Sequence, residues 1–194
     1  MGLSGVQRTL KFAKYLSKNK WKTTVITSGT TAYYAHDMSL LKEAVDSDIE
    51  IIRTKSLDPN SIMKGLGTVS MPKESLQKIM SKISKTGFIP DNKINWANQA
   101  YLKAKELLNK ENYDVLYVSI PPFSAFSSVA KLKKEFGIPL VVDYRDLWYG
   151  NHFAYYPTPY HKLKNKQLED AALRCADKII AVNRKIKEKL LPYQ

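Results

Sequence analysis

The chain has 194 residues, and 44% of them are hydrophobic, a share that excludes a globally disordered protein and allows a buried core. Its 31 lysines and arginines exceed its 18 acidic residues, and the net charge of +13 indicates an anionic partner without naming its class. Cys175 is the single cysteine, so an intrachain disulfide and a thiolate zinc site are excluded, and a reducing compartment, the cytoplasm, is expected.

The first part of the chain combines amphipathic helices with short strands. Residues 6–16 place apolar side chains on one helical face and basic ones on the other, which predicts an amphipathic helix. β-branched residues predict strands over residues 21–27 and 49–53, separated by a polar stretch. An Asp-Pro pair and two glycines predict a loop over residues 54–72, and residues 73–85 are expected to form a short basic amphipathic helix.

The second part of the chain alternates helices of crossover length with buried strands. Apolar patterns and breakers predict helices over residues 96–110, 125–136, 162–176 and 184–191. Between them they predict strands over residues 114–120, 140–143 and 178–182. A polar and aromatic loop is expected over residues 144–160. Strands that alternate with such helices pair in parallel, so the expected fold class is α/β, a Rossmann-like parallel sheet with helices on both faces.

A glycine-containing loop opens the chain and leads into the first predicted helix. A loop of this kind at a helix N-terminus often holds phosphate, with a strand before it. The sequence predicts no strand before Gly2, so the first strand of the sheet is expected to be missing. No apolar run approaches the roughly 18 residues of a membrane-spanning helix, and the first ten residues lack the apolar core of a signal peptide, so any membrane contact is expected from one side.

Three segments carry a family resemblance: GLSGVQRTLKFAKYL, YDVLYVSIPPFSAFSSVAKLKKEFGIPLVVDYRDLW and ADKIIAVN. Together they look like the N-terminal domain of glycosyltransferase family 4, and are most similar to its bacterial branch for capsule, O-antigen and exopolysaccharide synthesis. The resemblance covers most of residues 2–193, and its specific part is SIPPFS followed by GIPLVVDYRDLW. It implies a GT-B fold in which residues 1–194 are the acceptor-side domain, while the C-terminal donor domain is absent.

The resemblance also implies a reaction and its partners. A sugar would pass, with retention of configuration, from a nucleotide-sugar to a saccharide on a lipid carrier, at the inner face of the cell membrane. Neither a cofactor nor a metal ion is expected, because the family needs no Asp-x-Asp motif and Asp46-Ser47-Asp48 precedes a strand instead of following one. The absent donor domain would supply most cations for the leaving diphosphate, so the chain alone is expected to be inactive.

Three loops are expected to meet where open α/β sheets bind ligands, at the carboxyl ends of the strands. The first would hold the donor phosphate with the backbone of Gly2, Leu3, Ser4 and Gly5, or would be an ordinary turn with Ser4 as helix cap. The other two loops would bind the acceptor through Ser119, Pro122, Phe123, Ser124, Asp143 and Trp148. The alternative is that these residues have only structural roles: they end the strands, cap the next helix and pack the aromatic loop.

Arg145 and Asp146 are the candidate catalytic residues. By position, Arg145 matches a histidine that touches the donor sugar in related branches. Arginine can bind phosphate or a hydroxyl group but stays protonated, so it cannot act as a general base. The alternative is an ion pair with Asp143 or Asp146 that braces the loop. Another departure is Lys20, where relatives often have Gly, and lysine suits that turn only if its φ is not positive.

Basic segments are the candidate membrane contact, through Lys78, Lys82, Lys85 and the lysine-rich residues 162–166. Each basic residue near an anionic bilayer contributes on the order of 1 kcal/mol, although a solvated lysine face over a core helix gives the same pattern. The nearby aromatic loop, which could stack on a sugar or cover a lipid tail, contains Trp148, Tyr149, Phe153, Tyr155 and Tyr156.

Other chemistries find less support. His36, His152 and His161 are scattered without matching carboxylates, which argues against a metal site, and Cys175 is expected to fill core space. The competing class is a basic, non-enzymatic domain that binds nucleic acid or a membrane, although no nucleic-acid-binding motif is present and no nucleic acid is expected. A dinucleotide enzyme would need G-x-G-x-x-G after a strand, which the chain lacks.

Overall fold

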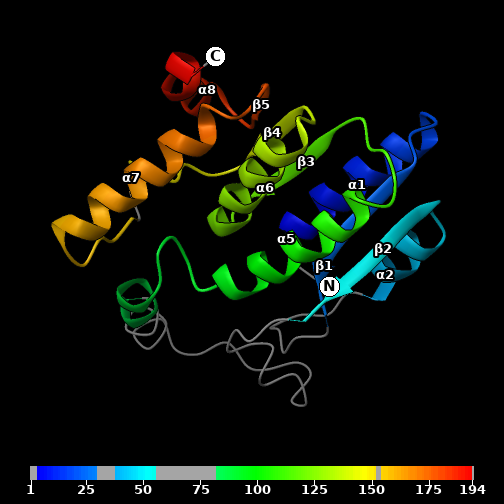
Figure 1. Ribbon diagram of the computed structural model, residues 1–194, viewed down its shortest axis with the longest axis horizontal. Helices are drawn as coiled ribbons and strands as arrows, with labels where there is room; N and C mark the ends of the chain where they lie inside the picture. Colours follow the sequence, from blue (N-terminus) through cyan, green and yellow to red (C-terminus); the bar gives the residue numbers. More distant parts are fainter. Residues whose placement is uncertain (1–3, 30–37, 56–81, 152–153, 194) are drawn as a thin grey trace. The chain divides into compact units, whose positions relative to one another are not determined.

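The computed structural model describes residues 4–29, 38–55, 82–151 and 154–193. The chain divides into two compact units, residues 1–72 and 73–194, and each is described by itself. Both units consist of parallel strands flanked by helices, which confirms the predicted α/β class (Figure 1). The helix expected over residues 73–85 lies outside the described residues up to residue 81, and residues 82–87 are helical.

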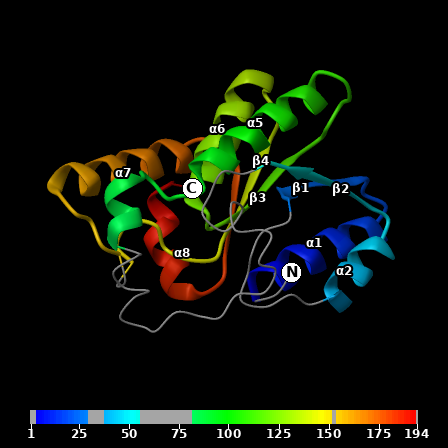
Figure 2. The same cartoon turned by 90° about the horizontal axis from the view of Figure 1, so that it is seen from below.

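The first unit is a two-stranded parallel sheet with two helices. In chain order it contains α1 (Ser4–Lys18), β1 (Thr23–Ser28), α2 (Met38–Val45) and β2 (Ile49–Thr54). Both helices lie on the same side of the strand pair (Figure 2). Leu10 and Leu40 are buried together between the helices, with Ile51 of β2 packed against them. The sequence patterns predicted α1 and both strands but missed α2, whose eight residues form barely two turns.

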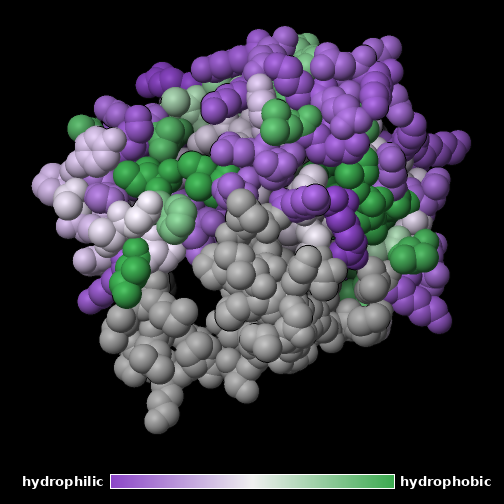
Figure 3. All heavy atoms as spheres, turned by 60° about the horizontal axis from the view of Figure 1, so that its bottom comes forward, coloured by the Kyte–Doolittle hydropathy of each residue, from purple (hydrophilic) through white to green (hydrophobic). Residues whose placement is uncertain are grey.

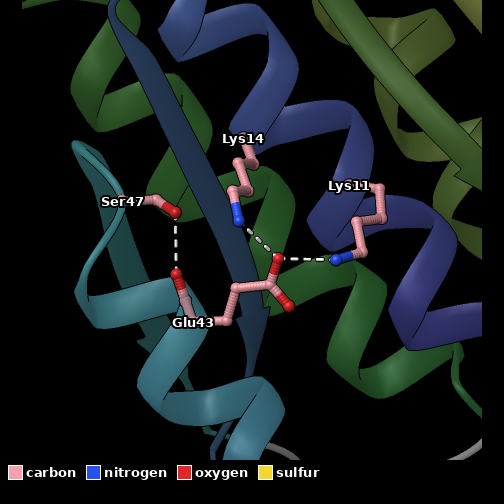
Figure 4. A network of polar contacts seen from close by, with 4 residues as sticks. All are labelled: Lys11, Lys14, Glu43 and Ser47. Atoms are coloured by element: carbon pink, nitrogen blue, oxygen red, sulfur yellow. Dashed lines mark hydrogen bonds and ion pairs between the residues drawn. The ribbon is translucent and has the colours of Figure 1, made fainter.

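A carboxylate joins the two helices of the first unit on their solvent side. Glu43 of α2 accepts hydrogen bonds from Lys11 Nζ at 2.6 Å and Lys14 Nζ at 2.7 Å, both in α1 (Figure 4). These two bonds lower the pKa of Glu43. Ion pairs in contact with water stabilise a fold only weakly. The apolar contact between the helices therefore supplies most of the stability, and the three charges fix how α1 and α2 are aligned.

Helix α1 ends in a Schellman motif with lysine at its left-handed position. Lys20 N–H donates to the Ser17 carbonyl at 2.9 Å, and Trp21 N–H donates to the Leu16 carbonyl at 3.1 Å. This pair of bonds requires a positive φ, and φ of Lys20 is 67°. We expected lysine to fit this turn only if its φ were not positive. The φ of Lys20 is positive, so the hydrogen bonds hold lysine in a conformation that suits glycine.

The second unit is a three-stranded parallel sheet in the order β3-β4-β5, formed by β3 (Leu116–Ile120), β4 (Leu140–Tyr144) and β5 (Lys178–Ala181). Its helices are α5 (Ile94–Leu108), α6 (Phe123–Phe136), α7 (Pro159–Leu173) and α8 (Arg184–Leu190), and a 3-10 turn follows at Leu191–Tyr193. Figure 2 shows α5 and α6 on one side of this sheet and α8 on the other. Helices on both faces were expected, and they are present.

The central strand β4 forms the middle of the core. Leu140, Val142 and Tyr144 have no exposed surface, and Ile120 of β3 and Phe126 of α6 are equally buried. These residues belong to one apolar cluster that also takes in α7 and α8. The long apolar run that predicted a buried strand over residues 140–143 therefore reflects its place between two neighbours.

Helix α7 begins three residues before the position predicted from its apolar pattern. The Thr158 side chain caps it by accepting a hydrogen bond from His161 N–H, and Pro159 occupies the first helical turn. Proline suits this position because its missing N–H would have no partner there. The cap, not the apolar pattern, sets the start of the helix.

Replacing Lys20 by glycine should stabilise the chain. A non-glycine residue in the left-handed region costs about 1 to 2 kcal/mol, and glycine loses part of that gain through its freedom in the unfolded chain, so we expect Lys20→Gly to raise the free energy of unfolding by about 0.5 to 1 kcal/mol. Urea denaturation measures this.

The reverse exchange is the matched control. Gly137 follows α6 with φ of 71°, and a Cβ atom there would meet no atom within 4 Å. Gly137→Lys should therefore destabilise the chain by a similar amount through backbone strain alone. A Lys20→Gly variant no more stable than the wild type would show that the turn carries no strain.

Candidate functional site

Two of the three predicted loops meet at the carboxyl ends of β3 and β4. Ser119 and Asp143 lie opposite each other in the parallel register, and Ser119 Oγ donates to Asp143 Oδ2 at 2.8 Å. Asp143 has no exposed surface. A carboxylate buried in this way requires polar partners, because an isolated buried charge is costly. Ser119 and Asp143 thus form a joined polar pair beneath the loops of the site.

Arg145 braces the turn that follows β3. Its Nε donates to the Ile120 carbonyl at 3.2 Å, and its Nη2 donates to the Pro121 carbonyl at 2.5 Å. Within the described residues Arg145 forms no ion pair with Asp143 or Asp146, so the ion-pair alternative is wrong. Asp146 is exposed. The guanidinium holds the Pro-Pro turn by its carbonyl oxygens while the arginine side chain stays half-buried at the site.

Asp91 holds the same turn from its other side, and the sequence patterns did not identify it. Its Oδ2 accepts hydrogen bonds from Phe123 N–H at 2.7 Å and Ser124 N–H at 3.1 Å, and its Oδ1 accepts one from Ser124 Oγ at 2.7 Å. These N–H groups open α6, where a negative charge also meets the positive end of the helix dipole. Ser124 was expected to cap this helix or contact the acceptor. Its hydroxyl group donates to Asp91 instead, and the N-cap position belongs to Pro122.

Trp148 is packed within the site. Its ring stacks on Phe123, with centroids 5.0 Å apart and planes 12° from parallel. Its Nε1 donates to Asn165 Oδ1 at 2.8 Å, and only 3% of the residue is exposed. The stack joins the start of α6 to the loop after β4, which favours the packing interpretation for most of this side chain. Trp148 is also among the residues that line a cavity of about 180 Å³.

Glu169 of α7 is a buried acid that the sequence did not reveal. Tyr144 Oη donates to its Oε1, and Tyr149 N–H donates to its Oε2 at 3.1 Å. Burial raises the pKa of Glu169 to about 7, against the opposite effect of these two hydrogen bonds. Burial and the neighbouring carboxylate also raise the pKa of Tyr144. The pair ties the end of β4 and the loop after it to α7.

The remaining predicted residues are spread over the chain. Gly2, Leu3, Lys78, His36, His152 and Phe153 lie outside the described residues. Ser4 and Gly5 begin α1 in the first unit, so the meeting of the glycine loop with the other two loops stays a prediction. Cys175 packs against the core of the second unit, as expected.

No metal site or membrane span is found where the structure describes the chain. Over those residues no group of three or more His, Cys, Asp and Glu side chains could hold a metal ion. The ring nitrogens of His161 lie 2.8 Å from Thr158 Oγ1 and 3.2 Å from the Thr86 carbonyl oxygen. Among the described helices, each is too short or too polar to cross a bilayer.

Comparison with known families assigns the chain. The model of the family described as Glycosyltransferase Family 4 matches residues 4–194. The chain belongs to glycosyltransferase family 4. A search of curated proteins finds no match. Membership confirms the resemblance at the level of the family, and it makes sugar transfer the class of reaction to which this domain belongs.

In this family 4 domain, the carboxyl ends of β3 and β4 combine three kinds of polar group. Asp143 is a hydrogen-bond acceptor joined to Ser119, Arg145 carries a permanent positive charge, and Asp146 is an exposed carboxylate. Of this set only Asp146 and Arg145 reach the surface, where they can accept a hydrogen bond from a sugar hydroxyl group and attract a phosphate, while the buried Asp143 joins the two strands beneath them. Asp91 and Glu169 support this set indirectly, because they accept hydrogen bonds from the backbone of the loops that carry these groups.

The raised pKa of Glu169 predicts a pH-dependent stability. Between an unfolded pKa near 4.5 and a folded pKa of about 7, the folded chain binds more protons, so the stability is greatest below this window and falls as the pH rises through it. We expect the free energy of unfolding to be higher at pH 5 than at pH 8, by roughly 2 to 3 kcal/mol at most. Urea denaturation at the two pH values measures it.

Glu169→Gln removes the titration and should abolish most of this difference. The control is Glu188→Gln, a change of an exposed glutamate of α8 that pairs with Arg184, which should keep the wild-type difference. If Glu169→Gln responds to pH as the wild type does, another group is responsible.

Proposed function

We propose that this chain is the acceptor-binding half of a retaining glycosyltransferase that moves a sugar from a nucleotide-sugar to a lipid-linked saccharide in bacterial surface polysaccharide synthesis. The observation that carries the proposal is the family 4 match over residues 4–194, combined with the polar groups that β3 and β4 bring together. An acceptor hydroxyl group would form the new bond to the anomeric carbon as the bond to the diphosphate breaks. The hydroxyl proton would leave with the diphosphate.

The described residues suggest separate tasks within that reaction. The exposed Asp146 carboxylate would accept a hydrogen bond from the acceptor saccharide, and the buried Asp143, joined to Ser119, would hold the strand ends that carry it. Arg145 would attract the donor phosphate while it keeps the Pro-Pro turn in place. The glycine loop, Gly2 to Gly5, would hold the donor phosphate with its backbone and the N-terminal end of α1. No step requires a metal ion or a cofactor.

A mixed basic and apolar surface supports placing the protein at the inner face of the membrane. Its exposed apolar side chains are Ile83, Phe88, Tyr155, Tyr160 and Leu163. The segments that carry them are in contact, because Lys82 Nζ lies 5.5 Å from the centroid of the Tyr155 ring. On the left of Figure 3, over the beginning of α7, pale and green side chains lie among purple ones. Aromatic, aliphatic and lysine side chains in one patch suit the headgroup region of an anionic bilayer.

The reaction can be tested in the organism that carries the gene. Deleting the gene should shorten the lipid-linked saccharide by one or more sugars, seen as a mass difference in extracted carrier lipids. Asp143→Asn should restore roughly tenfold less of the full-length saccharide than the wild-type gene, because the amide replaces the carboxylate that accepts the Ser119 hydrogen bond and so loosens the strand ends that carry Arg145 and Asp146.

The control for this test is Asp114→Asn, an exposed position before β3, which should restore the wild-type level. Immunoblots show whether the variants accumulate equally. An unchanged pool of lipid-linked saccharides after deletion would contradict the proposed acceptor.

Membrane binding is tested with vesicles. The chain should sediment with vesicles that contain phosphatidylglycerol and not with phosphatidylcholine alone. The double variant Lys82→Gln, Lys85→Gln should bind roughly thirtyfold more weakly, since each lysine contributes on the order of 1 kcal/mol. The same change at exposed Lys131 and Lys134 of α6 is the control. Tight binding to DNA at equal ionic strength without vesicle binding would favour the nucleic-acid alternative.

A further inference from the structure

Glu169 is a buried acid without a cationic partner. It lies on α7 with 7% of its surface exposed, and among the described residues neither lysine nor arginine pairs with it. The neighbouring carboxylate of Asp170 adds like charge. An ionised carboxyl group in such a place is costly, because burial removes its water and no positive charge replaces it. The pKa of about 7, raised mainly by burial, agrees with this environment.

The loop after β4 covers this acid. Tyr149 N–H donates to Glu169 Oε2 at 3.1 Å, and Trp148 N–H donates at 3.3 Å to Tyr144 Oη, whose own proton is donated to Glu169 Oε1. Tyr156 is joined to the same loop, since its Oη donates to the Trp148 carbonyl at 3.3 Å. Apart from β4 and α7, the backbone that approaches Glu169 belongs to this loop. Lifting the loop would therefore let water reach the carboxyl group.

The far end of the loop is attached by few bonds. Residues 145–151 form neither helix nor strand. Besides the bond from Tyr149, Lys189 Nζ of α8 donates to the Gly150 carbonyl at 3.3 Å, and both residues of this second bond are exposed. Hydrogen bonds that compete with water contribute little net stability. Because Trp148 is packed in the core, opening of the loop should begin at Tyr149 and Gly150.

Several other titratable or charged side chains lie around Glu169. They come from β4, the loop, α7 and the C-terminal segment, and they are Tyr144, Tyr149, Tyr156, Lys166, Asp170, Lys189 and Tyr193. Burial raises the pKa of Tyr144 and of Tyr156, and the hydrogen bond to Asp170 raises that of Tyr193 to about 12, so these three phenols stay neutral up to pH 8. The two lysines contact the loop, at the Tyr149 ring and the Gly150 carbonyl.

We propose that residues 145–150 form a pH-operated cover over Glu169, closed while this carboxyl group is protonated and opening as it ionises. Opening solvates the carboxylate and breaks the hydrogen bonds at Tyr149 and Gly150. The loop also carries Arg145 and Asp146, so the closed form would hold these two groups in position, and in this step alone the inference rests on the proposed function. Proton uptake then orders the site, and the domain binds an anion more tightly below neutral pH than above it.

Hydrogen exchange of the full 194-residue chain at pH 6 and pH 8 tests the opening. After correction for intrinsic rates, the amides of Trp148 and Tyr149 should be roughly tenfold less protected at pH 8. This is the change expected for an acid whose pKa falls on opening from about 7 to its ordinary value of 4.5. The amides of β4 should stay better protected than these two at both pH values, because the opening is local.

Four variants assign the response. Glu169→Gln removes the ionisable group and should give these amides nearly equal protection at the two pH values. Asp170→Asn, the adjacent carboxyl group, should keep most of the difference, as should His161→Gln, an imidazole joined to the loop through Asn165 and Trp148. Tyr144→Phe covers the case in which Glu169→Gln does not fold. It removes a hydrogen bond that lowers the pKa of Glu169, so the midpoint of opening should move to higher pH.

Four exchange results would overturn the proposal. They are loop protection that does not change with pH, a tenfold change that persists in Glu169→Gln, a change that disappears in Asp170→Asn or His161→Gln instead, and an unmoved midpoint in Tyr144→Phe.

Calorimetry with sulfate, which keeps its charge between pH 6 and pH 8, tests the link to the site. The wild type should bind sulfate roughly threefold or more tightly at pH 6, and Glu169→Gln should bind it equally at both pH values. Equal wild-type affinities would refute the link between the loop and the site. If sulfate binds at neither pH, the proposed role of Arg145 fails, whereas the exchange experiment still decides whether the loop opens.

Discussion

The burial of β4 is the constraint on which the second unit depends. The strand lies between β3 and β5, and its last two residues, Asp143 and Tyr144, are polar yet have no exposed surface. Each must find a partner inside the protein, because a buried polar group without one is costly. Ser119 partners the carboxylate and Glu169 partners the phenol. Both the polar pair of the site and the attachment of the following loop to α7 thus derive from the position of one strand.

The turn between β3 and α6 is held by opposite charges on its two sides. Arg145 donates to carbonyl oxygens before the helix, and Asp91 accepts from N–H groups at its start. Two consecutive prolines have no N–H group to donate. The turn can therefore be held only through the carbonyl groups on one side and the helical N–H groups on the other. A turn fixed in this way keeps Phe123 against Trp148 and so maintains one wall of the cavity.

The sequence predicted most of the fold because its signals are local. Apolar runs marked β3 and β4, and the rule that ligands bind at the carboxyl ends of strands brought the loops with Ser119 and Asp143 together, while the structure shows that these two residues pair. The short helix α2 escaped because eight residues give too little periodicity, and α7 began early because Thr158 and Pro159 define its start.

The outer residues of the site could not be predicted in the same way. Asp91 lies 32 residues from its partner Phe123, and Glu169 lies 25 from Tyr144. No periodic pattern relates positions so far apart. Arg145 was recognised, but its choice of carbonyl oxygens over carboxylates depends on the conformation of the Pro-Pro turn. Local residue types therefore indicated where the site lies, and long-range pairing decided how it is built.

The carboxylate at the start of α6 also affects where this domain can hold an anion. Helix N-termini attract phosphate, yet here the first N–H groups already hold a ligand that belongs to the chain. A tethered carboxylate competes at an effective concentration in the millimolar range or above, which a dilute nucleotide does not reach. Asp91 therefore acts as an internal competitor that closes this helix to phosphate. An anion that binds at this end of the sheet would then have to be held by other groups, such as Arg145, which carries a permanent charge at this turn.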